Sequence, residues 1–119
     1  MKNQAFHHRF AFAVNGLVAA WKGEASFRFQ CLACVGVIAV LIWRRPAPLW
    51  WAVLLTLSAL VLAAEMFNTA LETALDHLHP ERHAAIGIAK DCAAGAVLLL
   101  SIASAAVFCI FVIDSFSHG

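Results

Sequence analysis

The sequence predicts an all-α membrane protein, with three membrane-spanning helices and an amphipathic helix that lies on the membrane surface before them. The first observation is composition: 63% of the 119 residues are hydrophobic and 13% are charged, whereas a typical soluble domain has about 25% charged residues. The second is that the apolar residues form three long runs. Such a chain cannot cover itself with a wetted surface. At this length we expect one domain, over residues 1–119.

The three apolar runs define the expected spans, at residues 29–45, 49–76 and 90–114. A membrane-spanning helix needs roughly 20 residues, with about 17 as the lower limit. The uninterrupted apolar parts of the first two spans, residues 29–43 and 49–64, reach that length only if flanking residues such as Arg28 and Arg44 extend their charged ends to the interface.

Prolines and polar residues separate the runs. The stretch Arg44-Arg45-Pro46-Ala47-Pro48 predicts a tight turn, because proline cannot continue a helix and disfavours helix in the residue before it. Trp43, Trp50 and Trp51 flank this turn, as in the aromatic belt of a membrane interface. Residues 77–89 form the second connection.

Residues 1–28 predict the surface helix. They mix apolar side chains such as Phe10 and Leu17 with charged ones such as Arg9 and Lys22, which is typical of a helix lying in the interface.

The positive charges predict the orientation of the chain. With three spans, the amino-terminal segment and the second connection share one side of the membrane. That side holds six basic residues, and the other side holds two. The six are Lys2, Arg9, Lys22, Arg28, Arg82 and Lys90, and the two are Arg44 and Arg45. The positive-inside rule places the larger group in the cytoplasm, and the net charge of +1 gives no indication of a nucleic-acid partner.

Polar side chains end the second apolar run. Glu65, Asn68, Glu72 and Asp76 recur at i, i+3, i+7 and i+11, so they form one stripe on a helix. Ionisable groups at membrane depth are costly and are by default a functional hypothesis. The alternative is a helix end that emerges into water, but the other faces stay apolar. A stripe of acids would also repel itself without a cation, so we favour a functional site.

Glu24 and the pair Lys90-Asp91 precede the first and third spans on the same membrane side. Glu24 could be only a helix-surface partner of Arg28, and Lys90 only an interface anchor. Together with the stripe, however, they suit Mg²⁺, which takes one or two carboxylates plus phosphate oxygens. Phosphoryl transfer needs such a metal, a lysine, and a base near the attacking hydroxyl. The sequence has no GxxxxGK[ST] loop, so a nucleotide would need a non-standard site.

Other residues favour structural roles. Cys31 and Cys34 form a CxxC inside an apolar run, which indicates small buried hydrophobes on one helix face. His77, His79 and His83 favour solvated loop positions. Small residues on one side of the third span let membrane helices approach closely. Because three helices can hardly enclose a polar stripe, we expect a homo-oligomer with the site between subunits.

Three stretches resemble motifs of the small prokaryotic integral-membrane diacylglycerol kinases, from about Gly16 to the end of the third span. The most specific is Glu65-Met66-Phe67-Asn68-Thr69-Ala70-Leu71-Glu72 with Asp76 four residues later. An earlier motif is similar to Ala19-Ala20-Trp21, Glu24-Ala25 and Phe27-Arg28, and a later one to Glu81, His83 and Lys90-Asp91.

The resemblance implies a homotrimer in the bacterial plasma (inner) membrane, with its active site on the cytoplasmic side. It implies transfer of the γ-phosphate of ATP to the hydroxyl of diacylglycerol, giving phosphatidic acid. Glu65 would be the catalytic base with Asn68 as its polar partner, and Glu24 and Glu72 would hold the Mg²⁺ that accompanies ATP. The resemblance also implies nucleotide contacts at Glu24, Glu72, Glu81, His83, Lys90 and Asp91. It implies supporting roles for Asp76, Trp21 and Arg28.

Several alternatives remain open. Residues 93–99 look closer to the undecaprenol kinase branch of the same family, so the lipid is not decided. Upstream of Gly16 the family's aromatic and arginine positions have only loose counterparts in Phe12 and Arg9. A small proton-coupled transporter would carry its acid near mid-membrane, whereas these acids cluster at one end. A non-catalytic membrane subunit would not need the acids together with Lys90-Asp91.

Overall fold

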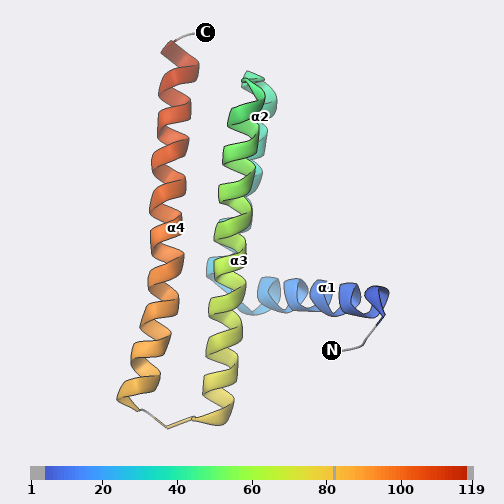
Figure 1. The fold of residues 1–119 in the computed structure, drawn as a ribbon, viewed down its shortest axis with the longest axis vertical. Coiled ribbons are helices and arrows are strands. Elements are labelled where there is room, and N and C mark those ends of the chain that lie inside the picture. The colour runs from blue at the N-terminus through green and yellow to red at the C-terminus, as the bar shows by residue number, and fades with distance from the viewer. Residues whose placement is uncertain (1–4, 82, 118–119) are drawn as a thin grey trace.

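The computed structural model describes residues 5–81 and 83–117, and within them the chain forms four α-helices and no strand (Figure 1). The helices are α1 (Phe6–Gly23), α2 (Ala25–Arg44), α3 (Pro48–Leu78) and α4 (Ala84–Ser117). Helices α2, α3 and α4 are each long and apolar enough to cross a membrane. The prediction of an all-α membrane protein with three spanning helices is therefore confirmed.

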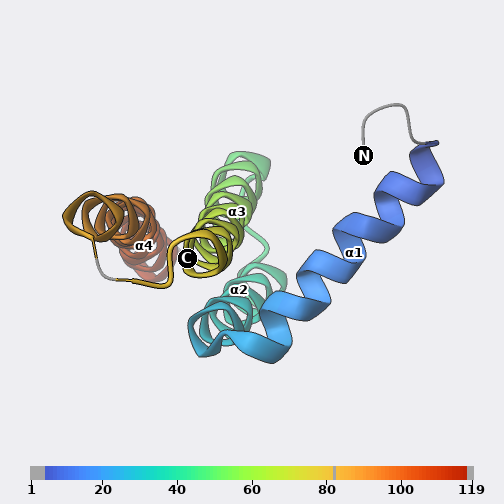
Figure 2. The same ribbon diagram turned by 90° about the horizontal axis from the view of Figure 1, so that it is seen from below.

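Helices α2, α3 and α4 run side by side, while α1 leaves the bundle nearly at a right angle (Figures 1 and 2). Helix α3 is central, since it packs against α1, α2 and α4. A helix perpendicular to the spans has the direction of one that lies in the membrane surface. The direction of α1 therefore agrees with the predicted surface helix.

The chain turns from α1 into α2 at a single residue. Helix α1 ends at Gly23, and Glu24 is extended, with φ −125° and ψ 110°. Residues 25–28, which the sequence analysis places in the surface helix, instead form the first turn of α2. Glycine is among the weakest helix formers, and its position just before the extended residue accounts for the early end.

The turn between α2 and α3 lies where the prolines predict it. Arg45 caps α2 in the left-handed region, with φ 46°. Pro48 is the first residue of α3, a position that suits proline because its missing N–H would have no partner there. The backbone thus reverses within three residues.

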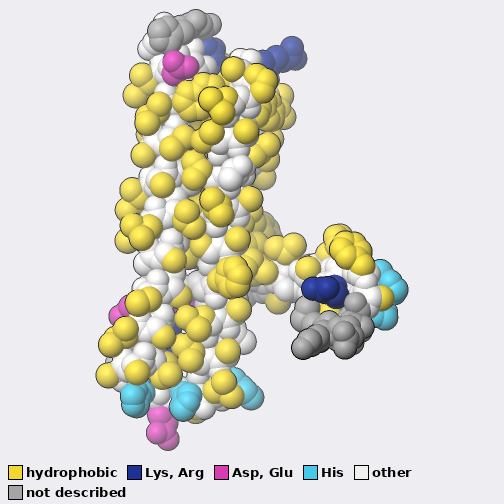
Figure 3. Space-filling view, in the orientation of Figure 1, with side chains coloured by type: hydrophobic (Ala, Val, Ile, Leu, Met, Phe, Trp, Pro, Cys, Tyr) yellow, Lys and Arg dark blue, Asp and Glu magenta, His cyan; other side chains and the backbone are white. Residues whose placement is uncertain are grey.

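Helices α3 and α4 are longer than the membrane is thick. Their 31 and 34 residues correspond to about 46 and 51 Å at 1.5 Å per residue, against about 30 Å of hydrocarbon. The 20 residues of α2 match that thickness. The ends of α3 and α4 therefore extend past the level of α1 (Figure 1), and their acidic and histidine side chains gather there (Figure 3).

One chain buries little of its apolar surface. Leu41, Leu54 and Phe111, from α2, α3 and α4, form a cluster near the α2–α3 turn. Elsewhere the spans are open: only 6% of the most apolar stretch of α4 is buried. These open faces must contact lipid or other protein chains, and the homotrimer implied by the resemblance stays a prediction.

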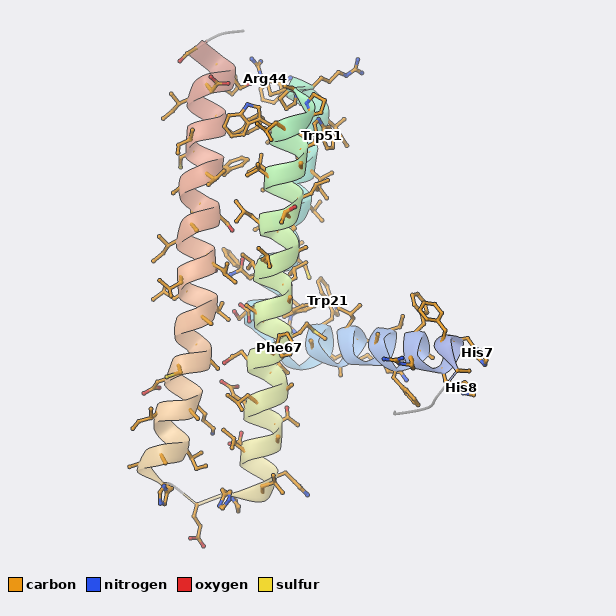
Figure 4. All side chains as sticks on the ribbon, viewed as in Figure 1. His7, His8, Trp21, Arg44, Trp51 and Phe67 are labelled. Carbon is orange, nitrogen blue, oxygen red and sulfur yellow. The ribbon has the colours of Figure 1, made fainter. Side chains whose placement is uncertain are left out.

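Arg44 joins the ends of α2 and α4 beside this cluster (Figure 4). Its Nε donates a hydrogen bond to Ser115 Oγ at 2.7 Å, and its Nη2 donates to the Ser115 carbonyl at 2.8 Å. Its guanidinium also lies 4.2 Å from the centre of the Phe116 ring, a cation–π contact. Arg44 thus has a structural role on the side with fewer positive charges. Of the other side's six basic residues, Lys2 and Arg82 lie outside the described residues.

Replacing Arg44 with alanine is expected to lower the free energy of unfolding by about 1–3 kcal/mol, because hydrogen bonds made by a charged group are lost. Thermal unfolding of the purified protein in detergent measures the change. Arg45→Asn is the matched control, since it removes the neighbouring charge and asparagine tolerates positive φ. Equal unfolding temperatures for Arg44→Ala and wild type would contradict this role.

Candidate functional site

Glu65 lies at the centre of the candidate site and is almost fully enclosed. It is 2% exposed and is the one buried charged side chain among residues 5–81 and 83–117. It follows Val61 by one turn on the buried face of α3, whereas Phe67, two residues later, points outward and is 77% exposed (Figure 4). A single chain therefore encloses this one acid, while the rest of the stripe is half-buried or exposed, and the site between subunits stays a prediction.

The corner between α1 and α2 covers Glu65. Ala20 and Phe27, on either side of the corner, are 1% and 3% exposed. Gly16 of α1 lies beside Met66 of α3, whose Cε would be 3.5 Å from a Cβ at Gly16. The Ser26 hydroxyl, in the first turn of α2, donates a hydrogen bond to Glu65 Oε1 at 2.6 Å. Glu65 thus lies at the level of α1, the helix predicted to lie on the membrane surface.

Arg28 fixes the corner. Its Nη1 donates to the carbonyl oxygens of Trp21 at 2.6 Å and Lys22 at 3.3 Å. These carbonyls belong to the last turn of α1, where backbone acceptors lack helical partners and a positive charge is favourable. The guanidinium therefore serves α1 rather than only pairing with Glu24 along a helix surface. Trp21 and Arg28, two of the three expected supporting residues, meet at this corner.

Asn68 and Glu72 continue the stripe toward water, and both are half-buried. Asn68 Nδ2 donates to Glu72 Oε1 at 3.4 Å, a long hydrogen bond. Asn68 Oδ1 is buried and has no partner in the described part of the chain. An unpaired buried acceptor is costly, so this oxygen is available to a hydroxyl or water brought by a ligand.

Asp76 and Lys90 form an ion pair between α3 and α4. Their side chains are 64% and 34% exposed, and exposed pairs contribute about 0–1 kcal/mol. The pair can therefore exchange for another anion at small cost. It lies about 16 Å from the level of Glu65, because eleven residues separate Asp76 from Glu65 along the helix.

A pocket of about 450 Å³ opens between the ends of α3 and α4, and Asp76, Glu81, His83 and Lys90 line it. His83 also begins α4, since its Nδ1 accepts from the Ala85 N–H at 3.1 Å and its carbonyl accepts from Gly87 N–H at 3.0 Å. The pocket thus gathers three of the expected nucleotide contacts, while the capping role of His83 was missed from the sequence.

The other expected ligands do not form a larger metal-binding cluster in the described part of the chain. The described residues contain no group of three or more His, Cys, Asp or Glu side chains placed to hold a metal. Mg²⁺ takes one or two protein carboxylates, so the half-buried Glu24 and Glu72 still suit it chemically. Asp91 is exposed and is absent from the pocket lining. The four cysteines are free, and Cys34 packs against α3 with its Sγ 3.9 Å from the Ser58 carbonyl.

Ser26 is the site residue that the sequence analysis missed. It follows Glu24 by two positions, at the start of the first apolar run. A serine at this position is typical of an ordinary helix N-terminus, so the sequence does not mark it as a functional residue. Only the packing of α2 against α3 reveals that it reaches Glu65.

Comparison with known proteins decides the family. The family model of prokaryotic diacylglycerol kinase matches residues 11–112 of the chain. The chain belongs to this family. A diacylglycerol kinase of Escherichia coli K12 is 30% identical over 105 residues, which are 88% of this chain and 86% of the relative. A diacylglycerol kinase of Synechocystis is 38% identical over 99 residues, 82% of this chain and 57% of the relative.

The family also includes a relative named for another lipid. An undecaprenol kinase of Bacillus subtilis is 27% identical over 99 residues, covering 83% of this chain and 80% of the relative. The chain is thus a multi-pass membrane protein and a lipid kinase of the diacylglycerol or undecaprenol type. The family favours this class over the proton-coupled transporter and the non-catalytic subunit.

Replacing Arg28 with alanine is expected to loosen α1, because two terminal carbonyls lose their charged donor. Backbone amides in residues 6–23 should exchange with deuterium about tenfold faster, as the loss of roughly 1.4 kcal/mol of local stability implies. Hydrogen exchange followed by mass spectrometry measures this rate. Lys22→Ala removes a positive charge from the same turn and should leave exchange unchanged. Equal amide exchange rates in Arg28→Ala and Lys22→Ala would contradict the proposed role of Arg28 in holding the end of α1.

Proposed function

We propose that the chain transfers the γ-phosphate of ATP, as its Mg²⁺ complex, to the hydroxyl of diacylglycerol, giving phosphatidic acid. The observation that carries this proposal is the enclosed Glu65 carboxylate at the level of the surface helix. The hydroxyl of diacylglycerol lies at that level of a membrane, because it is the polar end of the molecule. A base placed there meets the lipid hydroxyl without drawing the lipid out of the bilayer.

Glu65 would accept the proton of the lipid hydroxyl. The hydroxyl oxygen would attack the γ-phosphorus of ATP, and ADP would leave. General-base catalysis requires the base within hydrogen-bond reach of that proton. Ser26 occupies Oε1, so Oε2 is the oxygen left for the substrate. The unpartnered Asn68 Oδ1 is one turn further toward water and offers a second acceptor to the bound groups.

The nucleotide would bind in the pocket at the ends of α3 and α4, with its phosphates directed along the polar stripe toward Glu65. Lys90 would then exchange the carboxylate of Asp76 for phosphate oxygens, which the exposed ion pair permits at small cost. Glu72 lies between the two levels and, with Glu24, would hold Mg²⁺. When bound, this metal neutralises phosphate charge.

The second candidate substrate is undecaprenol. Residues 93–99 favour it, as does the named undecaprenol kinase relative. Both lipids present a hydroxyl at the interface and differ in the apolar part. Leu98 and Leu99, 60% and 72% exposed on α4, belong to the faces that such chains would contact.

The assembly and location follow from the same proposal. We propose a homotrimer in the bacterial inner membrane with the site on the cytoplasmic side. The open apolar faces of the spans support further protein contacts. The six-to-two distribution of basic residues supports the orientation.

The deciding experiment follows ATP-dependent phosphorylation of diacylglycerol and undecaprenol side by side, using the purified protein with and without Mg²⁺. We expect transfer to diacylglycerol that stops when Mg²⁺ is removed. A strong preference for undecaprenol would move the chain to the other branch. No transfer to either lipid by a folded oligomer would refute the proposal.

Glu65→Gln is expected to fold and to lower kcat by about 10²–10⁴-fold, the usual contribution of a general base. Glu72→Gln is the contrasting variant, because loss of a metal ligand should raise the Mg²⁺ concentration needed for half-maximal rate. Steady-state kinetics with varied lipid, ATP and Mg²⁺ separate the two effects. Near-normal turnover by Glu65→Gln, or an unchanged Mg²⁺ requirement in Glu72→Gln, would remove the corresponding assignment.

A further inference from the structure

Ser26 has a role that its position in the helix does not explain. A serine in the first turn of a helix commonly bonds to nearby backbone, but α2 has no side-chain cap bond at its start. Its hydroxyl instead crosses to α3 and donates to Glu65 Oε1 at 2.6 Å, a contact between residues 39 positions apart. A bond of this length is typical of a hydroxyl donating to an ionised carboxylate.

The backbone around Ser26 is held firmly. The next residue, Phe27, is 3% exposed and anchors the first turn of α2 in the bundle. Two residues after Ser26, Arg28 fastens the end of α1. Because the two residues that follow Ser26 fix this turn, the Ser26 hydroxyl is presented to Glu65 from a rigid support.

The carboxylate of Glu65 depends on that hydroxyl. A buried polar group without a hydrogen bond is costly, and Ser26 is the donor that Glu65 finds in the described residues. A terminal carboxylate turns easily about its last bond. The hydrogen bond from the Ser26 hydroxyl to Oε1 limits this rotation and keeps Oε2 pointing in one direction.

We propose that Ser26 is a positioning residue, whose hydroxyl orients Glu65 so that Oε2 meets the lipid hydroxyl. This inference rests on the proposed function, since it needs Glu65 as the base. It makes the corner between α1 and α2 part of the catalytic arrangement. In a rival account, Ser26 lowers the rate of transfer, because its hydroxyl would occupy the place of the substrate hydroxyl and would have to be displaced.

The test compares Ser26→Ala, Ser26→Thr and wild type in the lipid kinase assay, in detergent, with diacylglycerol and undecaprenol as acceptors. Ser26→Ala should lower kcat about tenfold or more, the effect of losing a hydrogen bond to a charged group. Its KM for ATP should stay within about twofold, because the nucleotide pocket is remote. Ser26→Thr keeps the hydroxyl and should recover most of the rate.

Ser101→Ala is the matched control. The Ser101 hydroxyl accepts an interhelical hydrogen bond from Gln30 Nε2 at 3.0 Å, so the control also loses one such contact, but away from Glu65. It should retain the wild-type kcat. If Ser26→Ala does not assemble, Ser26→Cys takes its place, because it keeps a side chain of similar size with a weaker donor.

The outcomes are distinct. An unchanged or higher kcat in Ser26→Ala, with wild type active, would overturn the positioning role, and a higher one would favour the rival account. A Ser26→Thr variant as slow as Ser26→Ala would also overturn it, since the loss would then come from packing. Wild-type protein inactive on both lipids would instead refute the proposed function itself.

Discussion

The arrangement depends on enclosing one carboxylate at the membrane surface. An acid in hydrocarbon is costly, and an acid in open water has no special access to a membrane lipid. Glu65 avoids both situations because the α1–α2 corner covers it and the Ser26 hydroxyl binds it. The direction of α1, the clamp of Arg28 and the early end of the surface helix at Gly23 all serve this enclosure.

The unequal lengths of the helices place polar side chains at two levels along the bundle. Helix α2 matches the hydrocarbon thickness, whereas α3 and α4 continue beyond it. The upper level holds the enclosed acid, and the lower holds an exposed pocket with an exchangeable ion pair. A lipid kinase has one apolar and one water-soluble substrate. In the proposed function, this division would give each substrate suitable surroundings, with Asn68 and Glu72 between them.

The opposite end of the bundle is built for stability. Leu41, Leu54 and Phe111 pack where the helices converge, and Arg44 ties α2 to α4. The rest of the apolar surface stays open in one chain. At the other end, an exposed ion pair joins the described parts of α3 and α4 beside the pocket that we propose for the nucleotide.

The sequence by itself determined the four-helix plan, the proline turn, the α3 stripe and the family. These are local patterns: apolar length, helix periodicity and a motif read along one segment. It did not determine that Ser26 contacts Glu65, that Lys90 pairs with Asp76 or that Arg28 binds the end of α1. Those contacts depend on how far the chain turns at Glu24 and how α2 and α4 pack on α3. Such angles arise from contacts between distant segments, so only the tertiary structure decided which polar side chains meet.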